Sequence, residues 1–202
     1  FLPNGNCVIL PNINGRGYGF FKITEGESSG LWSVLRLSED EVLKGSLLIT
    51  LYENLRWKTI SPQGFRDEML AYLPNESNSL LFSMALSYLG DCQRIFPSDS
   101  RPLEEALWRI VTTNPVSQHR LQAFRLYRSI ADSEEAVQRL YTLWQERKAP
   151  KDCALSESDY IGLSYILAIH LPEKADKIIA TQLSRIQNPD RKKEYQFISP
   201  SV

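Results

Sequence analysis

The chain has 202 residues, of which 23 are Lys or Arg and 24 are Asp or Glu, so its net charge is -1 and its pI is near 6.2. A chain of this length can bury about 70% of its unfolded surface. We therefore expect one domain, or one domain with a small appendage. Such a domain needs no disulfide or metal to stabilise its fold. The balanced charge supplies no cationic field for a polynucleotide, so we expect no nucleic-acid partner.

The three cysteines, Cys7, Cys92 and Cys153, are odd in number and show no C-x-x-C spacing. We expect scattered buried thiols, which do not fix the cell compartment, rather than a disulfide framework or a zinc knuckle. The most apolar run, at residues 160–171, is shorter than the roughly 20 residues that cross a bilayer, so it predicts a buried helix. The chain starts at Phe1 without a methionine or a signal-like segment, and we expect it to be a piece of something longer.

The segment at residues 10–23 reads LPNINGRGYGFFKI, and its glycines resemble part of a phosphate-binding loop. Gly15, Gly17 and Gly19 follow a G-x-G-x-G spacing, but Phe20 stands where a dinucleotide-binding loop needs its third glycine. Such a loop must also open a helix whose N-terminus faces the phosphates. A tight turn is therefore the favoured interpretation.

A β-hairpin is the structure that these residues predict. Residues 7–11 form a short apolar run and residues 17–24 form an aromatic-rich one. Between them lies Asn14-Gly15, a dipeptide typical of hairpin turns that need positive φ.

From about Leu31 to Gln187 the sequence predicts a succession of helices with short connections. Leu171-Pro172 ends one helix and starts the next. Capping signals mark the other starts: a capping box at Ser38–Glu41, a related one at Asp132–Glu135 with Asp132 as the cap, and the pairs Ser61-Pro62, Asn114-Pro115 and Asn188-Pro189.

Apolar residues recur at helical spacing and predict the buried faces. Two segments, residues 78–89 and 160–171, are apolar nearly all round, so we expect them in the middle of the packing. The three predicted stripes are Leu103, Ala106, Leu107, Ile110 and Val111; Ala136, Val137, Leu140, Tyr141 and Trp144; and Ala175, Ile178, Ile179, Leu183 and Ile186.

The spacing of the helices indicates a fold class. Alternate predicted helices recur at about 40 residues, the size of a two-helix solenoid unit, although no sequence motif repeats with them. We expect a mainly α fold: an irregular HEAT- or armadillo-like α-solenoid of antiparallel helix pairs, preceded by a short β-hairpin remnant. The predicted starts lie near residues 39, 62, 78, 101, 115, 133, 157 and 173.

No residue set stands out as a metal or catalytic site. His119 and His170 lie on different predicted helices, and neither belongs to an H-E-x-x-H pair, so structural or surface roles are favoured. The four tryptophans are too far apart to suggest an aromatic cage, and no nucleophile elbow, Walker loop or kinase signature occurs. We therefore assign no catalytic, cofactor-binding or metal residue.

Charged clusters have a structural explanation and a functional one. The carboxylate pairs fall in the first turns of predicted helices, where negative charge complements the helix dipole. The basic groups could grip a carboxylate, but a solvated helix face is favoured. The pairs are Asp40-Glu41, Glu104-Glu105 and Glu134-Glu135, and the basic groups are Arg120, Arg125 and Arg128, and Arg191, Lys192 and Lys193.

The sequence resembles a known family along nearly all its length. LPNINGRGYGFFKI is similar to the segment that closes the small β-sandwich domain of zinc aminopeptidases of the aminopeptidase N type. Residues 45–65, 125–146 and 155–202 resemble the C-terminal helical domain of bacterial members, most clearly in GSLLITLYENLRWKTISPQGF and RLYRSIADSEEAVQRLYTLWQE. The order of these pieces along the chain carries the resemblance.

The resemblance implies that the catalytic groups and the zinc site lie in an upstream domain, outside this segment. Residues 1–30 would end the β-sandwich domain and form a linker, and residues 31–202 would form a helical domain, which we expect to be truncated. Members are metallopeptidases whose upstream domain holds zinc through H-E-x-x-H and a later glutamate, motifs that this sequence lacks. This segment would hold no cofactor; its helical bowl would cover the active site and limit peptide entry. Bacterial members are often exported, which suggests the periplasm or the cell envelope.

Two other functions remain open. The chain could be a free-standing helical scaffold whose concave face binds a protein or a peptide. It could also be an enzyme with an unfamiliar site among its helices, although no convergent polar group stands out.

Overall fold

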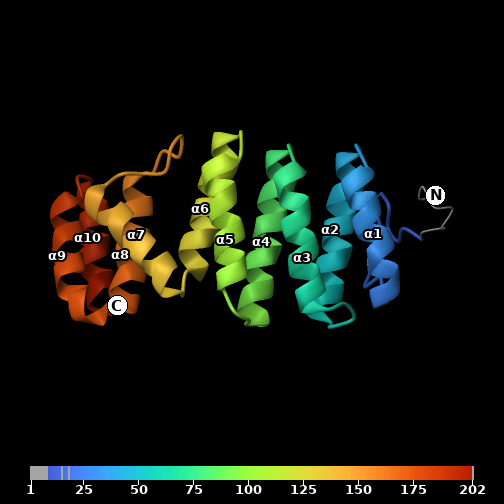
Figure 1. Ribbon diagram of the computed structural model, residues 1–202, viewed down its shortest axis with the longest axis horizontal. Helices are drawn as coiled ribbons and strands as arrows, with labels where there is room; N and C mark the ends of the chain where they lie inside the picture. The colour runs from blue at the N-terminus through green and yellow to red at the C-terminus, as the bar shows by residue number, and fades with distance from the viewer. Residues whose placement is uncertain (1–8, 15, 18, 202) are drawn as a thin grey trace. The chain divides into compact units, whose positions relative to one another are not determined.

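The structure is a computed structural model that describes residues 9–14, 16, 17 and 19–201. The chain divides into two compact units, Phe1–Ser98 (unit 1) and Asp99–Val202 (unit 2). Each unit consists of packed helices joined by short connections (Figure 1). The expectation of a mainly helical protein is therefore confirmed.

In unit 1, consecutive helices lie side by side and alternate in direction (Figure 1). Helix α2 contacts α1, α3 and α4, so it is the central element of this unit. The elements are α1 (Glu25–Leu37), α2 (Glu41–Arg56), α3 (Pro62–Tyr72), the 3-10 turn η1 (Leu73–Asn75) and α4 (Ser79–Ile95).

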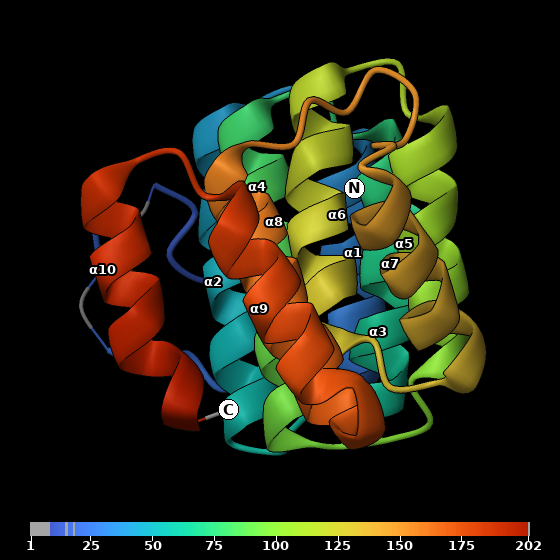
Figure 2. The same cartoon turned by 90° about the vertical axis from the view of Figure 1, so that its left-hand side faces the viewer.

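In unit 2, α8 contacts α6, α7 and α9, and Figure 2 shows α9 lying against α8. Tyr195 of α10 stacks on Tyr165 of α8 and hydrogen-bonds to Ser164, which attaches the last helix to the unit. The elements are α5 (Arg101–Thr113), α6 (Ser117–Ile130), α7 (Glu134–Glu146), α8 (Glu157–His170), η2 (Pro172–Lys174), α9 (Ala175–Arg185), α10 (Pro189–Ile198) and η3 (Ser199–Ser201).

Helix α1 starts at Glu25, earlier than the expected Leu31. Thr24 caps it, because its Oγ1 accepts a hydrogen bond from the backbone N–H of Glu27 and the Glu27 carboxylate accepts one from the Thr24 N–H. This is a capping box, which satisfies two of the amides that a helix start leaves unpaired. Residues 25–30, expected to be part of a linker, therefore belong to the first helix.

Other helix starts also differ from the predicted caps. Asp40, not Ser38, caps α2, because its carboxylate accepts hydrogen bonds from two backbone amides of the first turn. Ser133 takes the place expected for Asp132 at the start of α7. Asn114 follows the end of α5, and α6 begins only at Ser117. The caps expected at Ser61 and Asn188 are confirmed.

The expected β-hairpin is not confirmed. Residues 9–14, 16, 17 and 19–24 contain no strand; residues 7, 8, 15 and 18 of the predicted hairpin lie outside the described part of the chain. The physical reason is visible at Phe21 and Ile23, whose backbone groups bond to the side chain of Asn54 on α2 rather than to a neighbouring strand.

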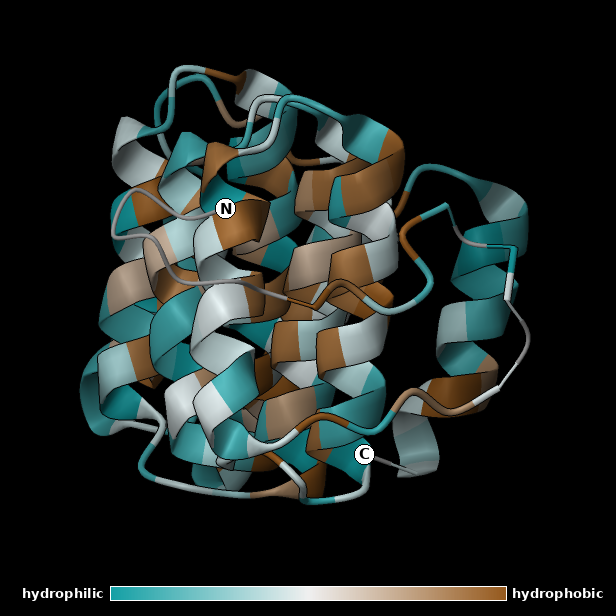
Figure 3. Cartoon of the chain, turned by 90° about the vertical axis from the view of Figure 1, so that its right-hand side faces the viewer, coloured by the Kyte–Doolittle hydropathy of each residue, from teal (hydrophilic) through white to brown (hydrophobic). Residues whose placement is uncertain are grey.

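The predicted stripes supply much of the core of unit 2. Leu107 and Leu140 are fully buried, and Ile178 is nearly so. The two segments expected in the middle of the packing are only partly enclosed, because α4 exposes Leu80 and α8 exposes Ile169. Figure 3 shows the same mixture, with apolar and polar residues interspersed along the helices. Within the described residues, no helix has the length and apolar character needed to span a membrane.

Candidate functional site

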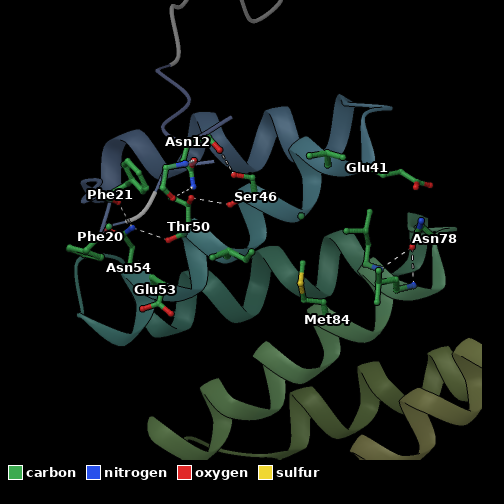
Figure 4. A pocket seen from close by; sticks show the side chains of 17 residues that line it. Asn12, Phe20, Phe21, Glu41, Ser46, Thr50, Glu53, Asn54, Asn78 and Met84 are labelled. Atoms are coloured by element: carbon green, nitrogen blue, oxygen red, sulfur yellow. Dashed lines mark hydrogen bonds between the residues drawn. The ribbon is translucent and has the colours of Figure 1, made fainter. Parts of the chain in front are cut away.

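An open pocket of about 970 Å³ lies in unit 1, bordered by α2, α4, Asn12, Gly17 and residues 19–21. Its apolar floor comes from α2 and α4, and its polar groups lie at the ends and along one wall (Figure 4). Apolar concave surfaces with a few convergent polar groups are typical of binding sites, which commonly enclose roughly 300–1,000 Å³. We call this feature the unit 1 pocket.

One wall of the pocket is a loop closed by Asn12 and Gly17. The Asn12 Oδ1 accepts a hydrogen bond of 2.6 Å from the Gly17 N–H, and the Asn12 Nδ2 donates one to the Gly17 carbonyl. The Ser46 hydroxyl of α2 donates to the Asn12 carbonyl at 2.6 Å, which fixes this loop on the helix. A Cβ at Gly17 would lie 2.8 Å from the Phe21 ring. This glycine therefore permits close packing, and the helix that follows starts only at Glu25, unlike the geometry of a phosphate loop.

Asn54 anchors the other end of the same wall. It is fully buried, its Oδ1 accepts from the Ile23 N–H at 2.9 Å, and its Nδ2 donates to the Phe21 carbonyl at 2.8 Å. The Thr59 hydroxyl also donates to the Asn54 Oδ1. One side chain thus holds residues 21–23 against α2.

The floor of the pocket exposes several large apolar side chains. Leu80 is 77% exposed, Val42 65% and Ile49 49%, whereas Leu81 is buried beneath them. Figure 4 shows Met84 between the two ends of the pocket. Leu80 lies in residues 78–89, which were expected in the middle of the packing, and no predicted stripe included Val42 or Ile49. The sequence did contain a signal for exposed apolar surface in α4, because that helix is apolar nearly all round.

The charged groups of the pocket are acidic. Glu41 and Glu53 lie at opposite ends in Figure 4, and among the described residues no lysine or arginine lines the pocket. Lys44 of the same helix is paired with Glu76, at 3.0 Å, and is mostly buried. Arg56 lies 3.5 Å from Glu53, so that end is partly neutralised. Because the charged side chains that line the pocket are carboxylates, its chemistry suits a cationic group, most clearly at the Glu41 end.

The arginines of α6 bind carboxylate and carbonyl groups of the same chain. The favoured interpretation, that these arginines form a solvated helix face, is therefore corrected. Arg125 makes two hydrogen bonds to the Asp159 carboxylate, at 2.9 and 3.2 Å. Arg128 donates to the Asp159 carbonyl, and Arg120 donates to the Lys151 carbonyl and pairs with Asp152. Burial opposes ionisation of Asp159, but hydrogen bonds from Arg125 and Ser156 outweigh it and lower its pKa to about 2. These contacts stabilise the packing of α6 on α8.

The second basic group and the carboxylate pairs have local structural roles. Arg191 at the start of α10 pairs with Glu157, at 3.1 Å, whereas Lys192 and Lys193 are exposed. Glu104 is buried and accepts hydrogen bonds from the start of α7, while its neighbour Glu105 is exposed. The remaining members, Asp40, Glu41, Glu134 and Glu135, cap or begin their helices, as expected.

The histidines and cysteines do not converge. His119 is fully buried in α6 and His170 is the last residue of α8. Cys92 and Cys153 are buried free thiols, and burial raises the pKa of both; Cys7 lies outside the described residues. Within the described part of the chain, no group of three or more His, Cys, Asp or Glu could hold a metal ion.

A smaller cleft of about 440 Å³ lies in unit 2 at the end of α7. Arg139, Lys148 and Lys151 line it together with Trp108 and one carboxylate, Glu146, so the cationic groups outnumber the anionic one. The Arg139 guanidinium lies 4.7 Å from the centre of the Trp108 ring. Planar guanidinium and ammonium groups beside an aromatic face form a surface suited to an anionic group such as a carboxylate.

No family model, curated protein or solved structure matches this chain.

Proposed function

We propose that this chain is the non-catalytic, C-terminal helical portion of a zinc-dependent aminopeptidase of the aminopeptidase N type. In this proposal its helices form a curved, HEAT-like stack that covers the active site of an upstream catalytic domain and restricts which peptides enter. Zinc and the hydrolytic groups belong to the upstream domain.

The observation that carries the proposal is the attachment of Asn12, Phe21 and Ile23 to α2. By resemblance the segment that contains these residues closes the β-sandwich domain, so its path decides where upstream domains join the helices. Ser46 holds it at Asn12, and Asn54 holds it at Phe21 and Ile23. A junction bonded through buried side chains suits an accessory domain that must keep a defined position relative to its neighbour.

The unit 2 cleft supports the proposal through its chemistry. Arg139, Lys148 and Lys151 offer cationic groups, and a peptide carries a carboxylate at its C-terminus. The resemblance assigns no role to these three residues. Substituting these residues would test whether unit 2 affects which peptides are selected.

The test compares this chain with the product of the full reading frame that encodes it. We expect the full product to contain H-E-x-x-H upstream, to bind zinc and to cleave aminoacyl reporter substrates in a zinc-dependent manner. We expect the isolated chain to do neither. Zinc-dependent cleavage by the pure chain, or a frame that holds no upstream peptidase motif, would overturn the proposal.

A stand-alone helical scaffold is the second candidate, and the unit 1 pocket favours it. An exposed apolar floor of this size is the kind of surface on which scaffolds bind partners. The reading frame separates the two candidates, because a scaffold would be encoded without a catalytic domain.

A further inference from the structure

The unit 1 pocket combines an unpartnered apolar floor with carboxylates at its ends. Val42, Ile49 and Leu80 present apolar surface to solvent, next to the more deeply placed Leu81 and Met84. Soluble proteins seldom leave several large apolar side chains together unless something binds there. The unbranched side chain of Met84 can adjust its rotamer to different apolar partners.

The two carboxylates set the size of the ligand. Glu41 and Glu53 are twelve residues apart on α2, which corresponds to about 18 Å along a helix. A single amino acid is too short to reach both, whereas an extended peptide covers that distance in about five or six residues. A peptide of that length would lay its side chains along the floor between the carboxylates.

The charge of the ends specifies the chemistry of the ligand. Glu39 and Asp40 directly precede Glu41 in the sequence, but only Glu41 lines the pocket, because the Asp40 carboxylate caps α2. At the other end both Glu53 and Phe20 line the pocket, and the Phe20 ring lies tilted by 46° against the exposed Trp57 ring, with their centroids 5.7 Å apart. A carboxylate near aromatic faces is a good receptor for a lysine or arginine side chain, and here the basic side chain of the ligand would share Glu53 with Arg56, which lies 3.5 Å away.

We propose that the unit 1 pocket binds a peptide segment in which apolar side chains lie between two basic residues. The apolar residues would cover the floor, and the basic residues would pair with Glu41 at one end and Glu53 at the other. This site does not rest on the aminopeptidase assignment, because it uses only residues of unit 1. The two proposals can therefore fail separately.

The test uses a fluorescein-labelled peptide of six residues, Lys-Leu-Ala-Leu-Leu-Lys, titrated with the full chain and followed by fluorescence anisotropy. Two matched peptides replace both lysines with glutamate or all three leucines with serine. We expect the parent peptide to bind at least tenfold more tightly than either control, which corresponds to about 1.4 kcal/mol, because each control loses either the end charges or the apolar side chains. We also expect its affinity to fall as salt rises. Equal binding of the three peptides would overturn the proposal.

Variants locate the binding on the protein. Ile49→Ser with Leu80→Ser removes apolar floor, and Glu41→Gln with Glu53→Gln removes the end charges. We expect the first pair to weaken binding about tenfold or more, and the second to weaken it several-fold and flatten its salt dependence. Ile169→Ser, an equally exposed change on α8, is the control and should bind as the wild type does.

All these positions are exposed or half-exposed, so thermal melting should show that the variants fold. Wild-type affinity in both variant pairs would overturn the proposal. So would a chain that fails to bind the peptide and instead dimerises through Ile49 and Leu80 in sedimentation experiments, because a second copy would then be the occupant. The glutamine variants alone keep the test valid if the serine pair is unstable.

Discussion

The Oδ1 of Asn54 accepts a hydrogen bond of 2.9 Å from the backbone N–H of Ile23, across 31 residues of sequence. Through the same side chain, the Nδ2 reaches the carbonyls of Phe21 and Thr50. Asn54 therefore does for Phe21 and Ile23 what a partner strand would do, because it satisfies one backbone carbonyl and one backbone N–H of a segment that is not in a helix or strand. The position of the pocket wall depends on this one amide.

Replacing Asn54 with alanine should lower the free energy of unfolding by about 2–3 kcal/mol, because several buried polar groups lose their partner together. Amide hydrogen exchange at Ile23 should accelerate more than at residues inside α4. Asn75→Ala is the matched control, because Asn75 is exposed and makes one long hydrogen bond to the Ala71 carbonyl. A denaturant titration that places both variants within 0.5 kcal/mol of the wild type would contradict this role.

Adjacent glutamates in α5 should respond very differently to the same change. The Glu104 carboxylate accepts hydrogen bonds from the backbone amides of Asp132 and Ser133 and from the Ser133 hydroxyl. Burial opposes its ionisation, but these bonds outweigh burial and lower its pKa. Glu104→Gln should therefore cost about 1–3 kcal/mol of stability, whereas Glu105→Gln should change it by less than about 0.5 kcal/mol. Chemical denaturation of the two variants decides the matter, and equal costs would show that the buried contacts contribute little.

Asp159 should give unit 2 an acid-sensitive component of stability. Its pKa lies near 2 in the folded protein, below the ordinary 3.8. Above about pH 4 the carboxylate is ionised in both states and its contacts stabilise the fold. As pH falls from about 4 towards 2, the unfolded chain takes up the proton first, so this contribution is lost.

Asp159→Asn should therefore be less stable than the wild type at pH 7, by about 1–3 kcal/mol, and the difference should shrink by pH 2. Urea titrations at several pH values measure both quantities. Asp152→Asn is the control, because that carboxylate is mostly exposed and pairs only with Arg120. A gap between wild type and Asp159→Asn that stays constant down to pH 2 would refute the coupling to this carboxylate.

Substitution by alanine should change the stability in opposite directions at two helical glycines. A Cβ at Gly26 in α1 meets nothing within 4 Å, so Gly26→Ala should stabilise the protein by roughly 0.5–1 kcal/mol through helix propensity. A Cβ at Gly162 would lie 2.7 Å from the Arg128 Nη1, and that guanidinium is held by the Asp159 carbonyl. Gly162→Ala should destabilise by about 1–2 kcal/mol. Thermal melts that rank Gly162→Ala above the wild type would show that Arg128 moves aside freely.

The helices could be predicted from the sequence because their signals are local. Ser61 and Asn188 cap helices that begin with proline, and Leu107 and Leu140, which belong to two different predicted stripes, are both buried as expected. The N-terminal segment could not, because strand propensity says only that a backbone is extended. Whether it pairs with a strand or with the side chain of Asn54 depends on a residue more than thirty positions away.

The candidate site shows the same difference between features set by local sequence and features set by tertiary contacts. Composition and helical periodicity, properties read within a few turns of chain, determined that this protein is mainly helical, that its charge is balanced and that its carboxylate pairs begin helices. Tertiary packing alone decided that Arg125 meets Asp159 and that Val42, Ile49 and Leu80 stay uncovered. Those outcomes depend on which helix lies beside which, and contacts between residues distant in sequence leave no periodic signal along the chain.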